Sequence, residues 1–180
     1  IREAILKLEF YGLLKTAPQS GSYVSGFSLK ILDSIFTDII KFNKEDFGSL
    51  IEARYYLEIN SAKLAATRRT ETDIAEMQEA LADYDAKANT GQPVVQDDML
   101  FHIKIASATK NTVIESMLLI IIPDLIKIIV DKNICHAKRC IDSMREHHKI
   151  LDAIVNKDAN GAGIAMAEHL QQMMDNRMSL

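Results

Sequence analysis

The sequence predicts an all-α protein, an antiparallel bundle of about six or seven helices with one short β-hairpin near its start. Three observations predict this class. Seven Gly and three Pro occur in 180 residues, so long stretches contain no residue that ends a helix. Strong helix formers such as Ala, Leu, Met, Glu and Lys are abundant. Apolar residues also recur at helical spacing, and with 48% hydrophobic residues the chain can bury a sizeable core.

The start of the chain has a pattern of its own. Residues 1–14 read as an amphipathic helix that is stopped by Gly12. A short strand follows, then a turn at residues 18–22, and then a returning strand at Tyr23 and Val24. A helix followed by a small hairpin is the closing half of a winged helix. We therefore expect residues 1–25 to be the C-terminal part of a winged helix-turn-helix domain.

Residues 26–180 are expected to form the helical domain. Apolar spacing and turn residues predict helices at 27–42, 46–68, 70–87, 95–110, 111–130, 138–156 and 161–177. Thr72 is the expected start signal of the 70–87 helix, and Asn111 is the expected cap of the next-but-one helix. Pro123 is expected to kink or strain that helix. The short loops between these segments favour antiparallel neighbours.

Asp98 and His102 form the first candidate site. They lie one helical turn apart on a stripe with Val95, Met99 and Ala106, so both side chains are expected to point inward. A buried carboxylate is costly unless it is paired or coordinated. The pair is therefore either half of a metal site or an Asp–His hydrogen bond inside the bundle.

Two further histidines extend this candidate site. His147 and His169 each share an inward stripe with apolar residues of the last two predicted helices. With Asp98 and His102 they give three nitrogens and one oxygen, a set that suits Zn²⁺, Ni²⁺ or Mn²⁺. Helical spacing alone does not separate His147 from His148, because His148 also fits an inward stripe.

Arg54 occupies a core position in the 46–68 helix. A guanidinium group is rarely buried without a partner. Arg54 therefore either pairs internally with Glu58, one turn later, or binds an anionic ligand.

Charge and composition limit the function classes. Residues 1–30 carry four basic and two acidic side chains, net +2, whereas the whole chain carries −4, which fits nucleic acid at one end only. The two cysteines, Cys135 and Cys140, match neither a zinc pattern nor a disulfide scaffold, so we expect a reducing cytoplasm. The most apolar run, residues 117–122, is too short to span a bilayer, so no membrane association is expected.

Several motifs resemble the GntR family of bacterial transcription regulators. Arg2-Glu3-Ala4-Ile5, Gly12-Leu13 and Ser20-Gly21-Ser22-Tyr23-Val24 resemble its DNA-binding module. The effector domain of its FadR subgroup, the FCD domain, is resembled by Glu52-Ala53-Arg54, Asp98-x-x-x-His102, His147-x-x-Ile150-x-x-Ala153-Ile154 and Ala167-Glu168-His169-Leu170. The resemblance covers essentially the whole chain.

The resemblance implies a role for each of these positions. Its metal ligands are Asp98, His102, His147 and His169, which favours His147 over His148. Arg54 would bind the effector carboxylate, and Asn111 would lie beside the effector pocket. Contacts to DNA are implied for Arg2 on the recognition helix and for Gln19 and Gly21 at the wing. Roughly two earlier helices and the start of the recognition helix would precede residue 1.

The leading hypothesis is therefore a cytoplasmic, homodimeric transcription regulator and not an enzyme. It would bind operator DNA through its full-length winged helix. A small carboxylate would be sensed through Arg54 and a divalent metal, with zinc expected first and nickel or manganese as alternatives. One competing hypothesis is a metal-dependent helical hydrolase that uses Glu58 or Glu168 as its base. The other is a non-sensing dimerisation domain with structural zinc.

Overall fold

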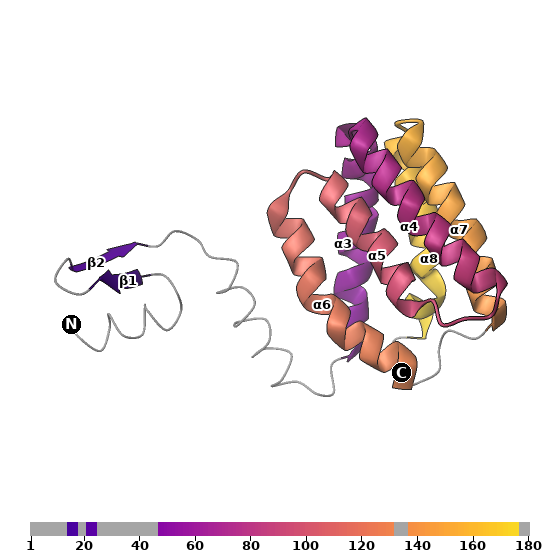
Figure 1. Ribbon diagram of the computed structural model, residues 1–180, viewed down its shortest axis with the longest axis horizontal. Helices are drawn as coiled ribbons and strands as arrows, with labels where there is room; N and C mark the ends of the chain where they lie inside the picture. Colours follow the sequence, from indigo (N-terminus) through magenta and orange to yellow (C-terminus); the bar gives the residue numbers. More distant parts are fainter. Residues whose placement is uncertain (1–13, 18–20, 25–46, 132–136, 177–180) are drawn as a thin grey trace. The chain divides into compact units, whose positions relative to one another are not determined.

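The structure is a computed structural model that describes residues 14–17, 21–24, 47–131 and 137–176 (Figure 1). Contacts divide the chain into two units, residues 1–45 and residues 46–180. The expected helices at 1–14 and 27–42 lie outside the described residues.

The first unit contains the β-hairpin that the sequence predicts. Strand β1 (Leu14–Ala17) pairs antiparallel with β2 (Gly21–Val24), so that Leu14 lies opposite Val24 and Ala17 lies opposite Gly21. The winged-helix domain to which we assign this hairpin, and its boundary at residue 25, stay predictions.

The second unit is a bundle of six helices within the described residues, which confirms the all-α class (Figure 1). They are α3 (Phe47–Arg68), α4 (Glu71–Asn89), α5 (Val95–Ala108), α6 (Thr112–Asp131), α7 (Ala137–Val155) and α8 (Ala159–Asp175). Helix α3 contacts α5, α6, α7 and α8 and is therefore the central element of the bundle. None of the helices in the described part of the chain is long and apolar enough to cross a membrane.

Two helix starts show how local sequence sets the element boundaries. The expected start at Thr72 is wrong: Thr70 caps α4 in a reciprocal capping box, where its hydroxyl accepts from the Asp73 amide and the Asp73 carboxylate accepts from the Thr70 amide. Asn111 caps α6 as predicted, since its Oδ1 accepts from the amides of Val113 and Ile114. Pro123 lies inside α6, which continues to Asp131.

Small and large side chains divide the core between them. Ala62, Ala65 and Ala66 of α3 are fully buried, as is Ala162 of α8, so these two helices pack closely. The larger core residues include Met77, Leu81, Tyr84, Phe101, Ile150 and Ile154. Five buried ionisable side chains come together between α3, α5, α7 and α8, namely Arg54, Glu58, His102, His147 and His169.

Candidate metal centre

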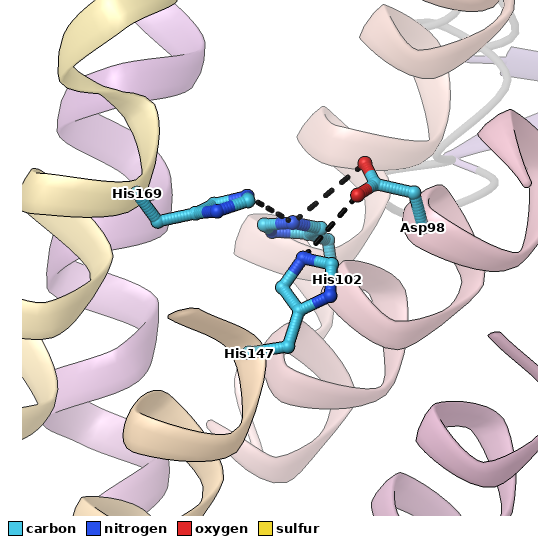
Figure 2. Close-up of side chains that lie close together, drawn as sticks. All are labelled: Asp98, His102, His147 and His169. Carbon is cyan, nitrogen blue, oxygen red and sulfur yellow. Dashed lines mark hydrogen bonds and ion pairs between the residues drawn. The ribbon is translucent and has the colours of Figure 1, made fainter. Parts of the chain in front are cut away.

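Four side chains from three helices converge in the bundle (Figure 2). Asp98 and His102 come from α5, one turn apart, His147 comes from α7, and His169 comes from α8. One potential ligand atom of each lies within 4.8 Å of those of the other three. The structure thus brings together the four residues to which the sequence assigns the metal.

The spacing of the ligand atoms suits a shared cation. His102 Nε2 and His169 Nε2 face each other at 3.2 Å. Asp98 Oδ1 lies 3.2 Å from His147 Nε2, and its Oδ2 lies 3.9 Å from His102 Nε2. Three imidazoles and a carboxylate gathered this closely provide the donor atoms that a divalent ion takes.

His147 gives the strongest indication that a group belongs among these side chains. Its ring packs between Tyr84 and Phe101, with both centroid distances 4.9 Å, and its exposed fraction is 0%. Neither ring nitrogen makes a hydrogen bond of standard geometry to any described residue, and Nε2 has only its ion-pair contact with Asp98. A buried polar atom without a partner costs about 1–3 kcal/mol, and coordination of an ion by His147 would remove that cost at one nitrogen.

The ambiguity between the two adjacent histidines is also resolved. His148 is half exposed, and its Nε2 lies 2.8 Å from Asp85 Oδ2 on the outside of the bundle. His147, one residue earlier, points inward to the cluster. The two side chains are about 100° apart around the helix, so only one of them can reach the cluster.

Burial affects the protonation of His147, His169 and Asp98. It lowers the pKa of His147, despite the nearby Asp98 carboxylate, and it lowers the pKa of His169 further together with the two neighbouring imidazoles. Burial alone would raise the pKa of Asp98, but His147 and the other histidines hold it well below its usual range. Neutral imidazoles and an ionised carboxylate are the forms that bind a metal.

Two glutamates contact the far side of the histidine rings. Glu58 Oε2 is in close contact with His102 Nδ1, and Glu146 Oε2 lies 2.8 Å from His169 Nδ1. Arg139 donates to both Glu146 oxygens, at 3.0 and 2.8 Å, and to the His169 carbonyl at 2.8 Å. Carboxylates behind ligating histidines fix the ring orientation and leave the other nitrogen free for a metal.

Arg54 lies beside this centre and is 2% exposed. Its Nε donates to Glu58 Oε1 at 2.5 Å, which is the internal pair considered from the sequence. Of the other two nitrogens, Nη1 donates to the Met173 sulfur, a weak acceptor, at 3.8 Å. Nη2 makes no hydrogen bond among the described residues, and its ion pair with Asp98 Oδ2 is long, at 3.9 Å. Burial would raise the pKa of Glu58, but Arg54 and His102 lower it to about 2.

The remaining candidate residues are not placed at this centre by any described contact. Asn111 serves as the α6 cap, and its part in effector binding stays a prediction. Gly21 begins strand β2, whereas Arg2 and Gln19 lie outside the described residues. Their contacts to DNA also stay predictions.

Comparison with known proteins gives the family. The sequence pattern of the FCD domain matches residues 49–172. The chain belongs to the FCD-domain family of GntR-type transcription regulators. The HTH-type transcriptional regulator LutR of Bacillus subtilis is 29% identical over 97% of this chain and 82% of its own length. The Uxu operon transcriptional regulator of Escherichia coli is 31% identical over 96% of this chain and 69% of its own length.

Solved structures agree with this FCD assignment. A GntR protein of Streptococcus agalactiae superposes with a TM-score of 0.69 at 26% identity, covering 99% of this chain and 80% of its own. E. coli McbR/YncC, at 22% identity and a TM-score of 0.61 over 99% of this chain and 83% of its own, shares the fold. The relatives of this FCD chain are transcription regulators and not enzymes, so the hydrolase hypothesis is wrong. Its place in the FadR subgroup stays a prediction.

The buried histidines make the metal-free FCD chain sensitive to acid. Because the pKa values of His147 and His169 lie below the ordinary 6.5, the unfolded chain takes up protons at a higher pH than the folded chain does. The contribution of these two histidines to stability is therefore constant above that value and falls as the pH decreases below it, by up to about 1.4 kcal/mol per pH unit for each histidine. The carboxylates add little in this window, since the ordinary values for Glu58 and Asp98 are 4.5 and 3.8.

Thermal melts in chelator check this expectation between roughly pH 7.5 and pH 5.5. The wild-type melting temperature should fall with pH, and His169→Gln should reduce the slope. A wild-type melting temperature that stays constant over the range would contradict the assignment of neutral, buried imidazoles.

Proposed function

We propose that this chain is the sensing part of a transcription regulator, in which Asp98, His102, His147 and His169 hold one divalent metal ion and Arg54 binds a small carboxylate effector beside it. The observation that carries the proposal is a juxtaposition. Four potential ligands lie within 4.8 Å of one another, and a buried guanidinium with an unused donor lies next to them.

The donor set favours zinc. Zn²⁺ takes imidazole nitrogens together with carboxylate oxygens. Ni²⁺ also binds imidazole nitrogens, whereas Mn²⁺ prefers oxygen ligands such as carboxylates. The bound ion would supply positive charge and a position for an anionic ligand. Buried, neutral imidazoles and an ionised Asp98 suit this role, and Glu58 and Glu146 would orient two of the rings.

Arg54 supports a carboxylate as the effector. Its nitrogen Nη2 is buried without a hydrogen bond in the described part of the chain. The hydrogen bond of Nη1 is to the Met173 sulfur, a weak acceptor. A planar guanidinium with one nitrogen without a hydrogen bond and one with only a weak acceptor can bind a carboxylate, and charge-assisted bonds of this kind are about twice as strong as neutral ones. Asp98 Oδ2 lies 3.9 Å from Arg54 Nη2, so one anion can reach both Arg54 and the metal centre.

The site offers a mechanism for control. Arg54 belongs to the central helix α3, whereas the metal ligands belong to α5, α7 and α8. An effector held by both would stabilise one arrangement of α3 relative to the other three helices. In a homodimer this would change the spacing of two winged helices on an operator with two-fold symmetry.

The test uses the full-length, metal-loaded regulator and its operator duplex in a fluorescence anisotropy titration. Sugar acids, hydroxy acids and dicarboxylates are added in turn. We expect at least one to change the operator affinity about fivefold or more, the lower end of usual allosteric coupling. An affinity that no member of the panel changes would contradict carboxylate control.

A structural zinc site is the second candidate. Four protein ligands are available, which is the number that closed structural zinc sites use. In that case chelation unfolds the chain and no carboxylate binds the metal-loaded form.

A further inference from the structure

We propose that Glu58 is a positioning residue that joins His102 and Arg54 into one unit, so that the metal site and the carboxylate site are oriented by the same side chain. This inference rests on the proposed function and adds a residue to it. It predicts that one substitution at Glu58 disrupts the orientation of either His102 or Arg54.

The contacts of Glu58 carry the inference. Glu58 is 1% exposed and lies on α3, one turn after Arg54. Oε1 accepts from Arg54 Nε at 2.5 Å, while Oε2 contacts Nδ1 of His102 on α5. The two oxygens of one carboxylate thus serve different helices and different functional groups.

The bond to Arg54 sets the direction of the guanidinium group. With Nε held by Glu58, Nη1 of Arg54 lies toward the Met173 sulfur and Nη2 lies toward Asp98 Oδ2. Nη2 of Arg54 is the buried donor that has no hydrogen bond to a described residue. Glu58 therefore directs the free edge of Arg54 to the metal centre.

The contact with His102 sets the tautomer of the imidazole. A carboxylate has acceptors only, so the Nδ1 that faces it carries the proton. In the neutral imidazole Nε2 is then unprotonated, and it faces His169 Nε2 at 3.2 Å, inside the cluster. This is the tautomer that binds a metal through Nε2.

Glutamine cannot replace Glu58 in both contacts. Its amide has one oxygen and one NH2 group. If the oxygen accepts from Arg54, the NH2 faces Nδ1 of His102 and stabilises the tautomer with the proton on Nε2. If the oxygen accepts from His102 instead, the NH2 opposes the N–H of Arg54. Either orientation breaks one half of the unit.

Glu146 provides a matched control. Its Oε2 lies 2.8 Å from His169 Nδ1, and both its oxygens accept from Arg139. Arg139 also donates to the His169 carbonyl at 2.8 Å, so it braces a metal ligand and does not extend to Asp98 by any described contact. Glu146→Gln should weaken metal binding without changing Arg54.

The experiment compares the wild-type full chain with Glu58→Gln and Glu146→Gln. Long-range ¹H–¹⁵N spectra of the metal-free chain report the tautomer of each histidine, and the Arg54 Nε–H resonance reports its hydrogen bond. Assignments come from single substitutions. Zn²⁺ affinity is measured separately by competition with a chelating dye, and circular dichroism confirms folding.

In the wild-type chain we expect His102 to be protonated at Nδ1 and the Arg54 Nε–H resonance to be shifted downfield. Glu58→Gln should move the His102 proton to Nε2 and weaken Zn²⁺ binding about 10 to 100-fold, or should move Arg54 Nε–H to the position of an exposed arginine. Glu146→Gln should weaken Zn²⁺ binding by a similar factor and leave both the His102 and the Arg54 signals unchanged.

Two results would overturn the inference. One is a wild-type His102 that carries its proton on Nε2, which decides the matter even if the variants do not fold. The other is a folded Glu58→Gln chain that keeps the wild-type His102 and Arg54 signals. Since these spectra need no metal, a wild-type chain that binds no Zn²⁺ would contradict the proposed function and leave the role of Glu58 to be decided by the spectra.

Discussion

Removal of the divalent ion is expected to lower the melting temperature of the chain by about 10 °C or more. A ligand present at about a thousand times its dissociation constant stabilises the folded state by about 4 kcal/mol. In a domain of this size each kcal/mol corresponds to a few degrees. The effect is expected because the ion would partner buried polar atoms, including a His147 nitrogen that has no hydrogen bond in the described structure.

Differential scanning fluorimetry of the metal-loaded chain, with and without chelator, gives this value directly. Restored Zn²⁺ should restore the melting temperature. His148→Gln is the matched control, because His148 is exposed and pairs with Asp85 outside the cluster, and it should respond as the wild type does. Metal-loaded and chelated chains that melt within about 2 °C of each other would contradict a specific site.

Substitution of Arg54 has the second large expected effect. Arg54→Gln is expected to weaken carboxylate binding to the metal-loaded chain about 100-fold, since two charge-assisted hydrogen bonds to one carboxylate contribute about 3 kcal/mol together. Isothermal titration with the carboxylate identified in the operator assay measures this loss. Zn²⁺ affinity should change much less, because Arg54 is not a ligand.

The control for Arg54 is a second, partly buried arginine of the same bundle. Arg139→Gln removes a guanidinium that pairs with Glu146 behind His169. At saturating Zn²⁺ its carboxylate affinity should match that of the wild type. Equal losses in the two variants would mean that Arg54 acts only through the general stability of the site. Because Arg54→Gln also leaves Glu58 with one partner fewer, its folding is checked first by circular dichroism.

The helices could be predicted because their apolar spacing is regular. Helical spacing also indicates Asp98, His102 and His169, whereas the choice of His147 over His148 rests on the resemblance to the FCD domain. The start of α4 could not be placed correctly. The capping box at Thr70 uses Asp73 where Glu or Gln is usual, so the common sequence pattern of a capping box does not identify it. Local chemistry that departs from the common pattern is therefore the first source of error.

The residues behind the ligands were a second source. Glu146 immediately precedes His147 and so points to a different side of α7, where it meets His169 of α8. Arg139 lies two turns before Glu146, and this spacing was the available signal. Contacts between helices depend on how the helices are rotated relative to one another, which the periodicity of one helix does not contain.

Arg54 shows why the alternatives from the sequence were both incomplete. The sequence offers an internal pair with Glu58 and an anion site as alternatives. In the structure Arg54 Nε donates to Glu58, while Arg54 Nη2 has no hydrogen bond to any described residue. A guanidinium group has five donors, so one pairing does not exhaust it, and only the three-dimensional arrangement shows which donors remain.

The most direct test of the central claim is elemental analysis of the purified full chain by inductively coupled plasma mass spectrometry. The comparison is with a His102→Ala, His169→Ala double variant and with His148→Gln. We expect about one divalent ion per chain in the wild type and in His148→Gln, and less than about a tenth of that in the double variant. No metal in a wild-type chain prepared with ample Zn²⁺, or equal metal in the wild type and the double variant, would contradict the assignment of Asp98, His102, His147 and His169 as a metal site.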